Sequence, residues 1–149
     1  MPLFRVELDM PHHGWMLLHF YAQGEHLAFE ASAFFDGLNK LVQGLLRVAQ
    51  DELPTRVQWA GEPEELVFNF AKAQEKIELS IAYQWIREGT HTVEFHPIAG
   101  TREEICLPFR SALRSLELRL EGIETSQRDW YEGFPYRELA LLTEQLGKS

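Results

Sequence analysis

Two neighbouring runs of alternating residues, 65–71 and 77–84, constrain the fold of this chain more than any other feature. Every second position in each run is apolar, as in strands with one buried face: Leu66, Phe68 and Phe70, then Ile77, Leu79, Ile81 and Tyr83. A connecting loop with an even number of residues places Phe70 opposite Leu79. An odd loop places Phe70 opposite Glu78 and breaks the buried face. The runs therefore predict an antiparallel hairpin with a loop of two or four residues.

Other alternating runs predict further strands. They cover 3–9, 15–21, 55–60 and 90–96, and shorter runs begin at His26 and Glu104. In the run 90–96, parity places Val93 and Phe95 inward and Glu94 and His96 outward. The turn between the first two strands contains Pro11 and Gly14.

Three segments have helical periodicity. The first is expected at about 33–50, with Ser32 as its N-cap. Pro108 suits the first position of a second helix, which Gly122 would end, and Pro135 suits the start of the last. The sequence thus predicts one α+β domain over 1–149, with an antiparallel sheet of about six strands and about three helices packed on one face. The predicted core contains Phe35, Leu38, Leu45, Trp59, Phe68, Phe70, Leu79, Ile81, Phe95, Leu113, Leu116 and Leu142.

Charge and composition narrow the possible partners. The chain has 149 residues and a net charge of −9, which disfavours nucleic-acid binding. The charge would either speed association with a basic protein partner or only keep the protein soluble. Apolar runs are too short to span a membrane, and the beginning of the chain does not resemble a secretory signal. Cys106 is the one cysteine, and its apolar neighbours indicate a small buried side chain. We expect a cytoplasmic protein with no membrane or nucleic-acid partner.

Four of the six histidines lie in PHHGWMLLHFYAQGEH, residues 11–26. His12 and His13 fall in the predicted turn, and His13 lies roughly 20 Å from His19 along an extended strand. No metal-binding spacing is present. We expect no metal and no cofactor, and we interpret this stretch as a strand with histidines at its ends.

The segment His91 to His96 is a second candidate for chemistry. Glu94 and His96 would share the outer face of one strand, about 7 Å apart, where a carboxylate can orient an imidazole. An enzyme with a Glu94/His96 site is therefore an alternative to a binding protein. The other interpretation of this segment is a polar strand face exposed to solvent.

The sheet face away from the helices is the predicted binding surface. It combines acidic residues with aromatic anchors, a composition typical of a protein interface. If this face is covered by a second copy of the chain, the protein is instead a homodimer with a structural role. Trp130 to Phe134 is a further aromatic segment, which can either seal the core or bind a partner. The predicted face contains Glu7, Asp9, Trp15, His19, Tyr21, Asn69, Glu78, Glu94 and His96.

Four short motifs connect this layout with a group of small bacterial α+β proteins. They are Phe35-Asp36-Gly37-Leu38, Val57-Gln58-Trp59, Leu107-Pro108-Phe109-Arg110 and WYEGFPYREL at 130–139. The layout is similar to that of the immunity proteins of bacterial polymorphic-toxin systems. The resemblance implies a small, acidic, cytoplasmic, non-catalytic protein that binds and neutralises a toxin.

Overall fold

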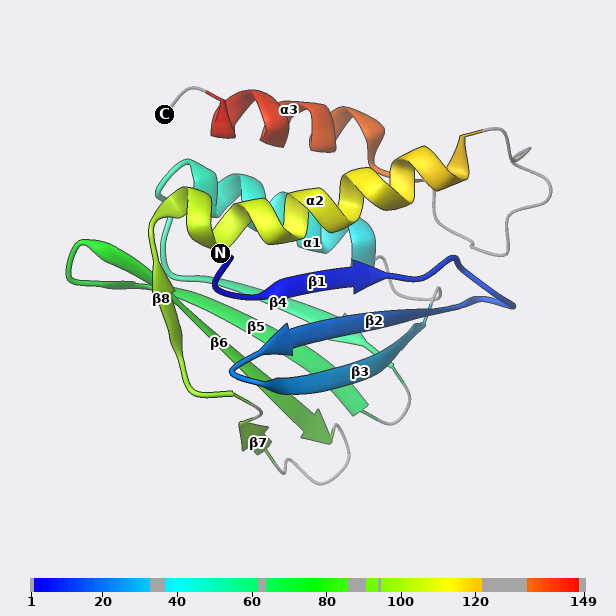
Figure 1. Cartoon of the computed structure of the whole chain (residues 1–149), viewed down its shortest axis with the longest axis horizontal. Coiled ribbons are helices and arrows are strands. Elements are labelled where there is room, and N and C mark those ends of the chain that lie inside the picture. Colours follow the sequence, from blue (N-terminus) through cyan, green and yellow to red (C-terminus); the bar gives the residue numbers. More distant parts are fainter. Residues whose placement is uncertain are drawn as a thin grey trace.

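The computed structural model describes residues 2–32, 37–61, 64–85, 91–93, 95–121 and 134–147. Within these ranges the chain forms an α+β fold of three helices and antiparallel strands (Figure 1). The elements in chain order are β1 Arg5–Leu8, β2 Trp15–Ala22, β3 Glu25–Ser32, α1 Gly37–Ala49, β4 Thr55–Ala60, β5 Glu64–Ala73, β6 Lys76–Trp85, β7 His91–Val93, β8 Ile98–Gly100, α2 Arg102–Leu120 and α3 Tyr136–Leu146.

The strands form two sheets, so the prediction of a single sheet is wrong. One sheet has the order β1-β2-β3, and the other has the order β4-β5-β6-β7, with β8 also pairing with β6. Helix α1 stands between β3 and β4 in the chain and separates the two groups of strands. Alternation of apolar residues identifies strands and their buried faces, but it does not identify which strands pair, so it could not reveal the division.

The predicted hairpin has the expected register. Phe70 pairs with Leu79 and Phe68 with Ile81, and the loop is the shorter of the two alternatives because Ala73 pairs with Lys76. Its first loop residue, Gln74, has a left-handed φ of 59°. The β2–β3 hairpin is built in the same way: Ala22 pairs with Glu25 around Gln23, whose φ is 56°.

The strand predicted at 90–96 is shorter than expected. It ends as β7 at Val93, and β8 pairs farther along the same strand, β6. Phe95 is buried and His96 is exposed between the two short strands. Pro97, directly before β8, has no main-chain N–H to offer a ladder. His96 therefore lies outside a strand, contrary to the prediction, and Glu94 lies outside the described residues.

The start of the second helix also differs from the prediction. Thr101 and Glu104 form a capping box, each side chain accepting from the other's main-chain N–H, and this box starts α2 at Arg102. The strand predicted at 104–107 is therefore helix, and Pro108 lies inside α2. Ser32 ends β3, and the described part of α1 covers Gly37–Ala49; residues 33–36, where the first helix was predicted to begin, lie outside the described residues. The start of α3 directly after Pro135 agrees with the prediction.

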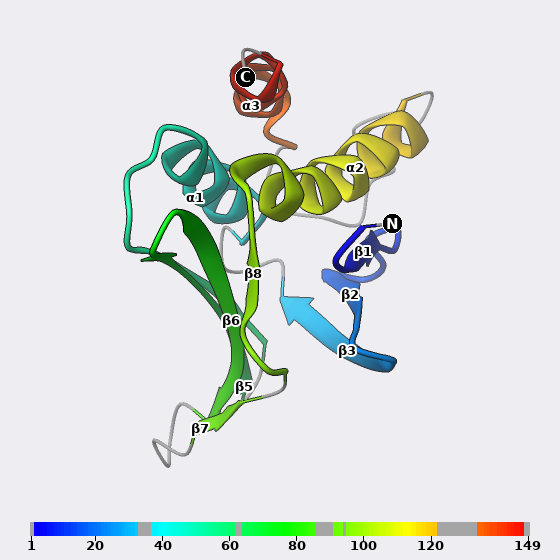
Figure 2. The same ribbon diagram turned by 60° about the vertical axis from the view of Figure 1, so that its left-hand side comes forward.

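The helices lie on one side of both sheets (Figures 1 and 2). Helix α1 packs on β4, and α2 packs on β1 and also contacts β6 and β8. Helix α3 packs on α1 and α2 and forms an outer layer. No helix in the described part of the chain is long and apolar enough to cross a membrane.

A continuous cluster of buried side chains joins both sheets to the helices. Phe109 of α2 contacts Phe4 beside β1 and Phe68 of β5, with ring centroids 5.4 and 5.3 Å away. All predicted core residues in the described ranges are buried, and Phe35 lies outside those ranges. Cys106 is fully buried, and burial raises the pKa of its thiol to about 12.

Candidate functional site

The face of the β1-β2-β3 sheet that points away from the core presents an organised group of polar and aromatic side chains. Strand alternation sends Val6, Phe20 and Phe29 into the core and sends their neighbours outward. Register then aligns the outward residues in cross-strand rows: Arg5, Tyr21 and His26 in one row, Glu7, His19 and Ala28 in the next. We call this surface the outer face.

Two histidines on the outer face form a hydrogen-bonded chain with a carboxylate. His19 Nε2 lies 3.0 Å from Asp9 Oδ2, and His19 Nδ1 lies 2.9 Å from His26 Nε2. The His19 side chain is 17% exposed and the Asp9 side chain is 51% exposed. The imidazole of His19 is therefore fixed at both nitrogens in a partly desolvated position.

The same histidines stack with an aromatic ring and a guanidinium. The rings of His26 and Tyr21 are nearly parallel, with centroids 4.4 Å apart, and the His19 and His26 rings are 5.1 Å apart. Arg5 places its Cζ atom 4.3 Å from the centre of the Tyr21 ring. Arg5, Tyr21, His26, His19 and Asp9 thus form one connected row, which we call the imidazole ladder.

The protonation of the ladder follows from its hydrogen bonds. An Asp9 carboxylate accepts, so His19 donates from Nε2. With both imidazoles neutral, His19 Nδ1 is then an acceptor, and His26 donates from Nε2. Each ring is held in one tautomer, and a positive charge placed on His19 would lie directly against Asp9.

The ladder presents oriented imidazole rings at the surface, which a ligand could contact. Among the described residues, no serine, threonine or cysteine is hydrogen-bonded to either imidazole. Within the same ranges, no group of three or more His, Cys, Asp or Glu residues is arranged to hold a metal ion. The thiol of Cys106 is buried in the core and far from ionising at neutral pH.

Five of the predicted partner-binding residues come together on or beside the outer face: Glu7, Asp9, Trp15, His19 and Tyr21. Asn69 and Glu78 lie in the other sheet, on β5 and β6, so the prediction that all nine share one sheet face is wrong. The predicted residues are separated because the strands are divided between two sheets. His96 lies between β7 and β8, outside the strands of either sheet, and Glu94 lies outside the described residues.

Sequence reasoning missed His26 and Arg5 as site residues. The signal for His26 was available in the turn, because a two-residue loop at Gln23-Gly24 places His26 directly opposite Tyr21. Arg5 was visible only as an exposed strand residue, and its position over Tyr21 depends on the β1–β2 register.

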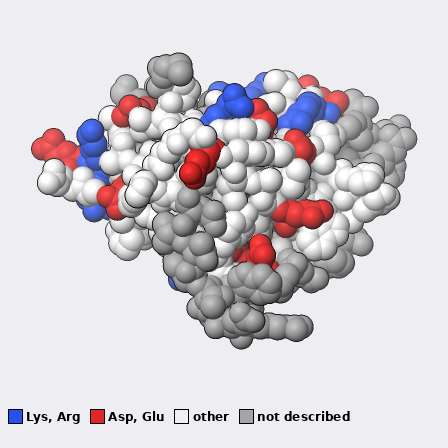
Figure 3. Space-filling model, turned by 60° about the horizontal axis from the view of Figure 1, so that its bottom comes forward, with Lys and Arg blue, Asp and Glu red and all other residues white. Residues whose placement is uncertain are grey.

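The surroundings of the ladder are acidic and open. An open hollow of about 620 Å³, lined by residues 2–5 and 21–26, lies at the Tyr21 end. Figure 3 shows Asp and Glu side chains across the middle of the molecule as seen from below, with Lys and Arg towards its upper edge and left end. Beside the ladder, Glu7, Glu25 and Glu30 are exposed.

Of the aromatic segment before α3, only its last residue is described. Phe134 is buried and packs against Tyr136, with ring centroids 4.8 Å apart. This position agrees with a role in sealing the core. Residues 130–133 lie outside the described ranges.

Comparisons with protein-family models, curated proteins and solved structures find no match to this chain.

Proposed function

We propose that this chain is a non-catalytic protein-binding module that captures a basic partner on the outer face. The observation that supports this most directly is the imidazole ladder, a stacked and hydrogen-bonded row at the surface with acidic side chains around it. Pre-ordered rings lose little conformational freedom when a partner covers them. A row of rings that is already ordered therefore suits the binding of a protein partner.

Aromatic and charged groups would contribute differently to binding. Tyr21 and Trp15 are half-buried, so their rings are held in place and still offer contact area to a partner. Glu7, Asp9 and Glu30 would attract Lys and Arg side chains over a longer range. The acids would then mainly govern the association rate, and the rings the dissociation rate.

A catalytic role for the ladder is the weaker alternative. The row Asp9, His19, His26 has the order of a relay, but among the described residues no serine, threonine or cysteine continues it beyond His26. A binding role uses every member of the row, whereas a relay leaves Tyr21 and Arg5 without a purpose.

Within protein-binding modules, we propose the toxin-neutralising class. The supporting points are the resemblance in layout and short motifs, the net charge of −9 and the acidic outer face. A cationic toxin that acts on nucleic acid would meet such a surface with complementary charge.

The test is affinity capture from the native cell with matched variants. The double variant Trp15→Ala/Tyr21→Ala removes the rings of the outer face, and Tyr136→Ala removes an exposed ring on α3 as a control. We expect wild type and Tyr136→Ala to retain the same basic protein, and the double variant to lose it. Retention should fall as salt is raised.

Thermal unfolding of each variant shows whether the fold is intact. If the folded double variant retains the same partners as wild type, the outer face is not the binding site. If the retained protein is acidic and unaffected by salt, the proposal of a basic partner is wrong.

A further inference from the structure

The hydrogen bond between His19 and His26 joins two side chains of the type that changes charge near neutral pH. Nδ1 of His19 lies 2.9 Å from Nε2 of His26, and the two ring planes are 21° apart. The ring centroids lie 5.1 Å apart, as expected for two rings joined edge to edge by a nearly straight N–H···N bond. One ring must donate and the other accept, so a single proton lies between these two nitrogens.

A first added proton has an open place on His26. In the neutral pair, His26 donates from Nε2, and its Nδ1 carries no proton. In the described part of the chain, Nδ1 makes no hydrogen bond, and the His26 side chain is exposed. A proton from solvent can therefore add at Nδ1 and leave the bond to His19 in place. That bond then has a charged donor, which strengthens it.

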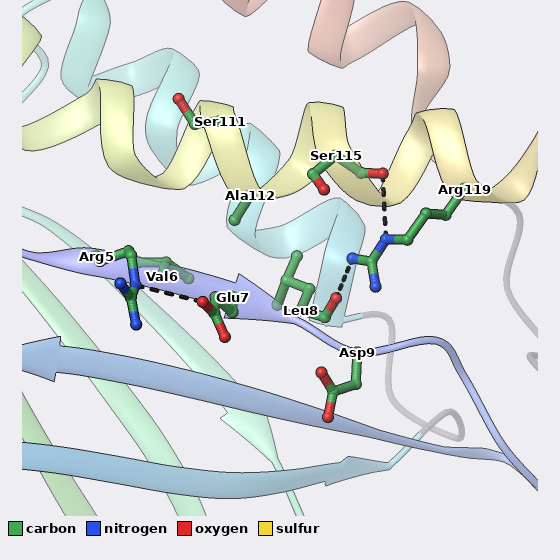
Figure 4. A pocket seen from close by; sticks show the side chains of 9 residues that line it. All are labelled: Arg5, Val6, Glu7, Leu8, Asp9, Ser111, Ala112, Ser115 and Arg119. Carbon is green, nitrogen blue, oxygen red and sulfur yellow. Dashed lines mark hydrogen bonds and ion pairs between the residues drawn. The ribbon is translucent and has the colours of Figure 1, made fainter.

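The added charge is stabilised on either ring. On His26 it lies parallel to the Tyr21 ring, whose centroid is 4.4 Å away and whose face attracts a cation. If the shared proton crosses to Nδ1 of His19, the charge lies 3.0 Å from Asp9 Oδ2 instead. Figure 4 shows the Asp9 side chain turned away from α2. Both arrangements keep the hydrogen bonds of the row, so one added proton leaves the imidazole ladder intact.

A second added proton is incompatible with the pair. All four ring nitrogens would then carry a hydrogen, and two N–H groups would face each other across 2.9 Å. Two donors cannot bond, and the two like charges repel. The His19 side chain is 17% exposed and is held by Asp9, whereas His26 is exposed. The pair would therefore separate by a movement of His26, out of its stack with Tyr21.

Other charged side chains near the pair affect proton uptake but take no part in the bond. In the described part of the chain they are Arg5 and Glu7 of β1, Glu25 and Glu30 of β3, and Arg119 of α2. Arg5 is paired with Glu7 at 3.3 Å and lies over the Tyr21 ring, and Arg119 donates to main-chain oxygens of α2 and β1 (Figure 4). The carboxylates favour proton uptake and the guanidiniums oppose it. The difference between the first and the second proton comes from the bond between the imidazoles.

We propose that the His19–His26 pair is a pH-sensitive switch of the outer face, which accepts one proton without a change of structure and opens when it accepts a second. Opening would expose the face of the Tyr21 ring and leave two added positive charges among the carboxylates. The effect on a basic partner rests on the proposed function: the partner would be retained near neutral pH and released in acid. The switch itself is measured on the free chain, so either proposal can fail without the other.

The test is an NMR titration of the ¹⁵N-labelled full chain from about pH 8 to about pH 4.5. An N–H···N bond produces a scalar coupling between its two nitrogens. We expect this coupling between His19 Nδ1 and His26 Nε2 at neutral pH, and its loss once all four ring nitrogens are protonated. Contacts between the His26 and Tyr21 rings should disappear in the same step, while the amide signals of β5 and β6 stay unchanged.

Two variants separate the switch from a general effect of acid. In His26→Gln, the side-chain amide stays neutral and can turn to donate to His19 or accept from it. His19 should then take up its proton with the Tyr21 ring signals unchanged. His13→Gln changes a histidine in the turn before β2, outside the pair, and should open as wild type does.

Three results would overturn the inference. The first is the absence of the coupling at neutral pH, and the second is an unchanged His26–Tyr21 contact when both rings are charged. The third is loss of that contact only together with unfolding of the whole chain.

Discussion

The side-chain amide of Gln23 pairs with the main chain of His96, donating from Nε2 to His96 O at 2.9 Å and accepting from His96 N at 3.1 Å. Gln23 lies in the β2–β3 turn, and His96 lies between β7 and β8. In the described part of the chain no strand pairing joins the two sheets, so this bridge and the Tyr83 hydroxyl bond to β3 are polar links between them.

We expect Gln23→Ala to lower the free energy of unfolding by about 1 kcal/mol more than Gln74→Ala does. Gln23 and Gln74 both stand first in two-residue hairpin loops, with φ of 56° and 59°, so the change to Ala imposes the same backbone cost at both positions. Of these two glutamines, only Gln23 makes the hydrogen bonds to His96. Urea unfolding of the two variants measures the difference, and equal losses would show that the bridge contributes nothing to stability.

The close contact between α1 and β4 gives a second prediction. A Cβ on Gly44 would lie 2.3 Å from Cγ2 of Val57, so Gly44→Ala must push the helix away from the sheet. We expect a loss of about 1–2 kcal/mol, the cost of overpacking reduced by the better helix propensity of Ala.

The control for this variant is Gly147→Ala. Its Cβ would meet Thr143 O at 3.4 Å, an ordinary contact, and its φ of −76° suits any residue, so stability should hardly change. Thermal unfolding compares the two. A Gly44→Ala protein as stable as wild type would mean that α1 can move at little cost.

Strand positions and buried faces in this fold could be predicted from local sequence, and the pairing of strands could not. Alternation fixed the register of Phe68 with Ile81, because a shift by one residue would expose the apolar face. The same alternation does not show whether β3 pairs with β4. Whether the strands form one sheet or two depends on how α1 and α2 pack against both groups of strands. That packing is a property of the whole chain.

Local signals also competed at the start of α2. Proline is common at the first position of a helix, but Thr101 and Glu104, seven and four residues before Pro108, form a capping box that starts α2 at Arg102. For the site, parity placed Glu7, His19 and Tyr21 together, and the ladder required the β2–β3 register as well. The approach of His26 to His19 is a diagonal contact between strands, which no single run of sequence encodes.

The tautomers of the ladder are a third prediction. With both rings neutral, nitrogen chemical shifts in an NMR spectrum should show His19 and His26 each protonated at Nε2, since Asp9 accepts from one and His19 Nδ1 from the other. Asp9→Asn replaces the carboxylate with an amide, which can donate to Nε2 and release the preference of His19. A mixture of tautomers at His19 in the wild type would contradict the hydrogen-bonded chain.

Burial of Cys106 predicts a specific loss of stability in alkali. The folded chain holds the thiol neutral up to about pH 12, whereas an unfolded chain ionises it near its ordinary pKa of 9.0. Because the folded-state pKa is the higher one, this contribution to stability is fully present below pH 9 and is lost as the pH rises towards 12. At pH 10.5 the loss should be about 2 kcal/mol, the free-energy equivalent of the ionisation available to the unfolded chain alone.

Cys106→Ala isolates this effect from the tyrosines and lysines that titrate in the same range. The smaller side chain of the variant should lower the free energy of unfolding by the same amount at every pH. The wild type should therefore lose its advantage over the variant as the pH rises from 8 to 10.5. Denaturant unfolding at a series of pH values measures this difference. A thiol reagent should modify Cys106 in the native protein only as fast as the chain opens, because the side chain is fully buried. Parallel pH profiles for wild type and variant, together with rapid modification of the native thiol, would mean that the α2 face carrying Cys106 opens readily to solvent.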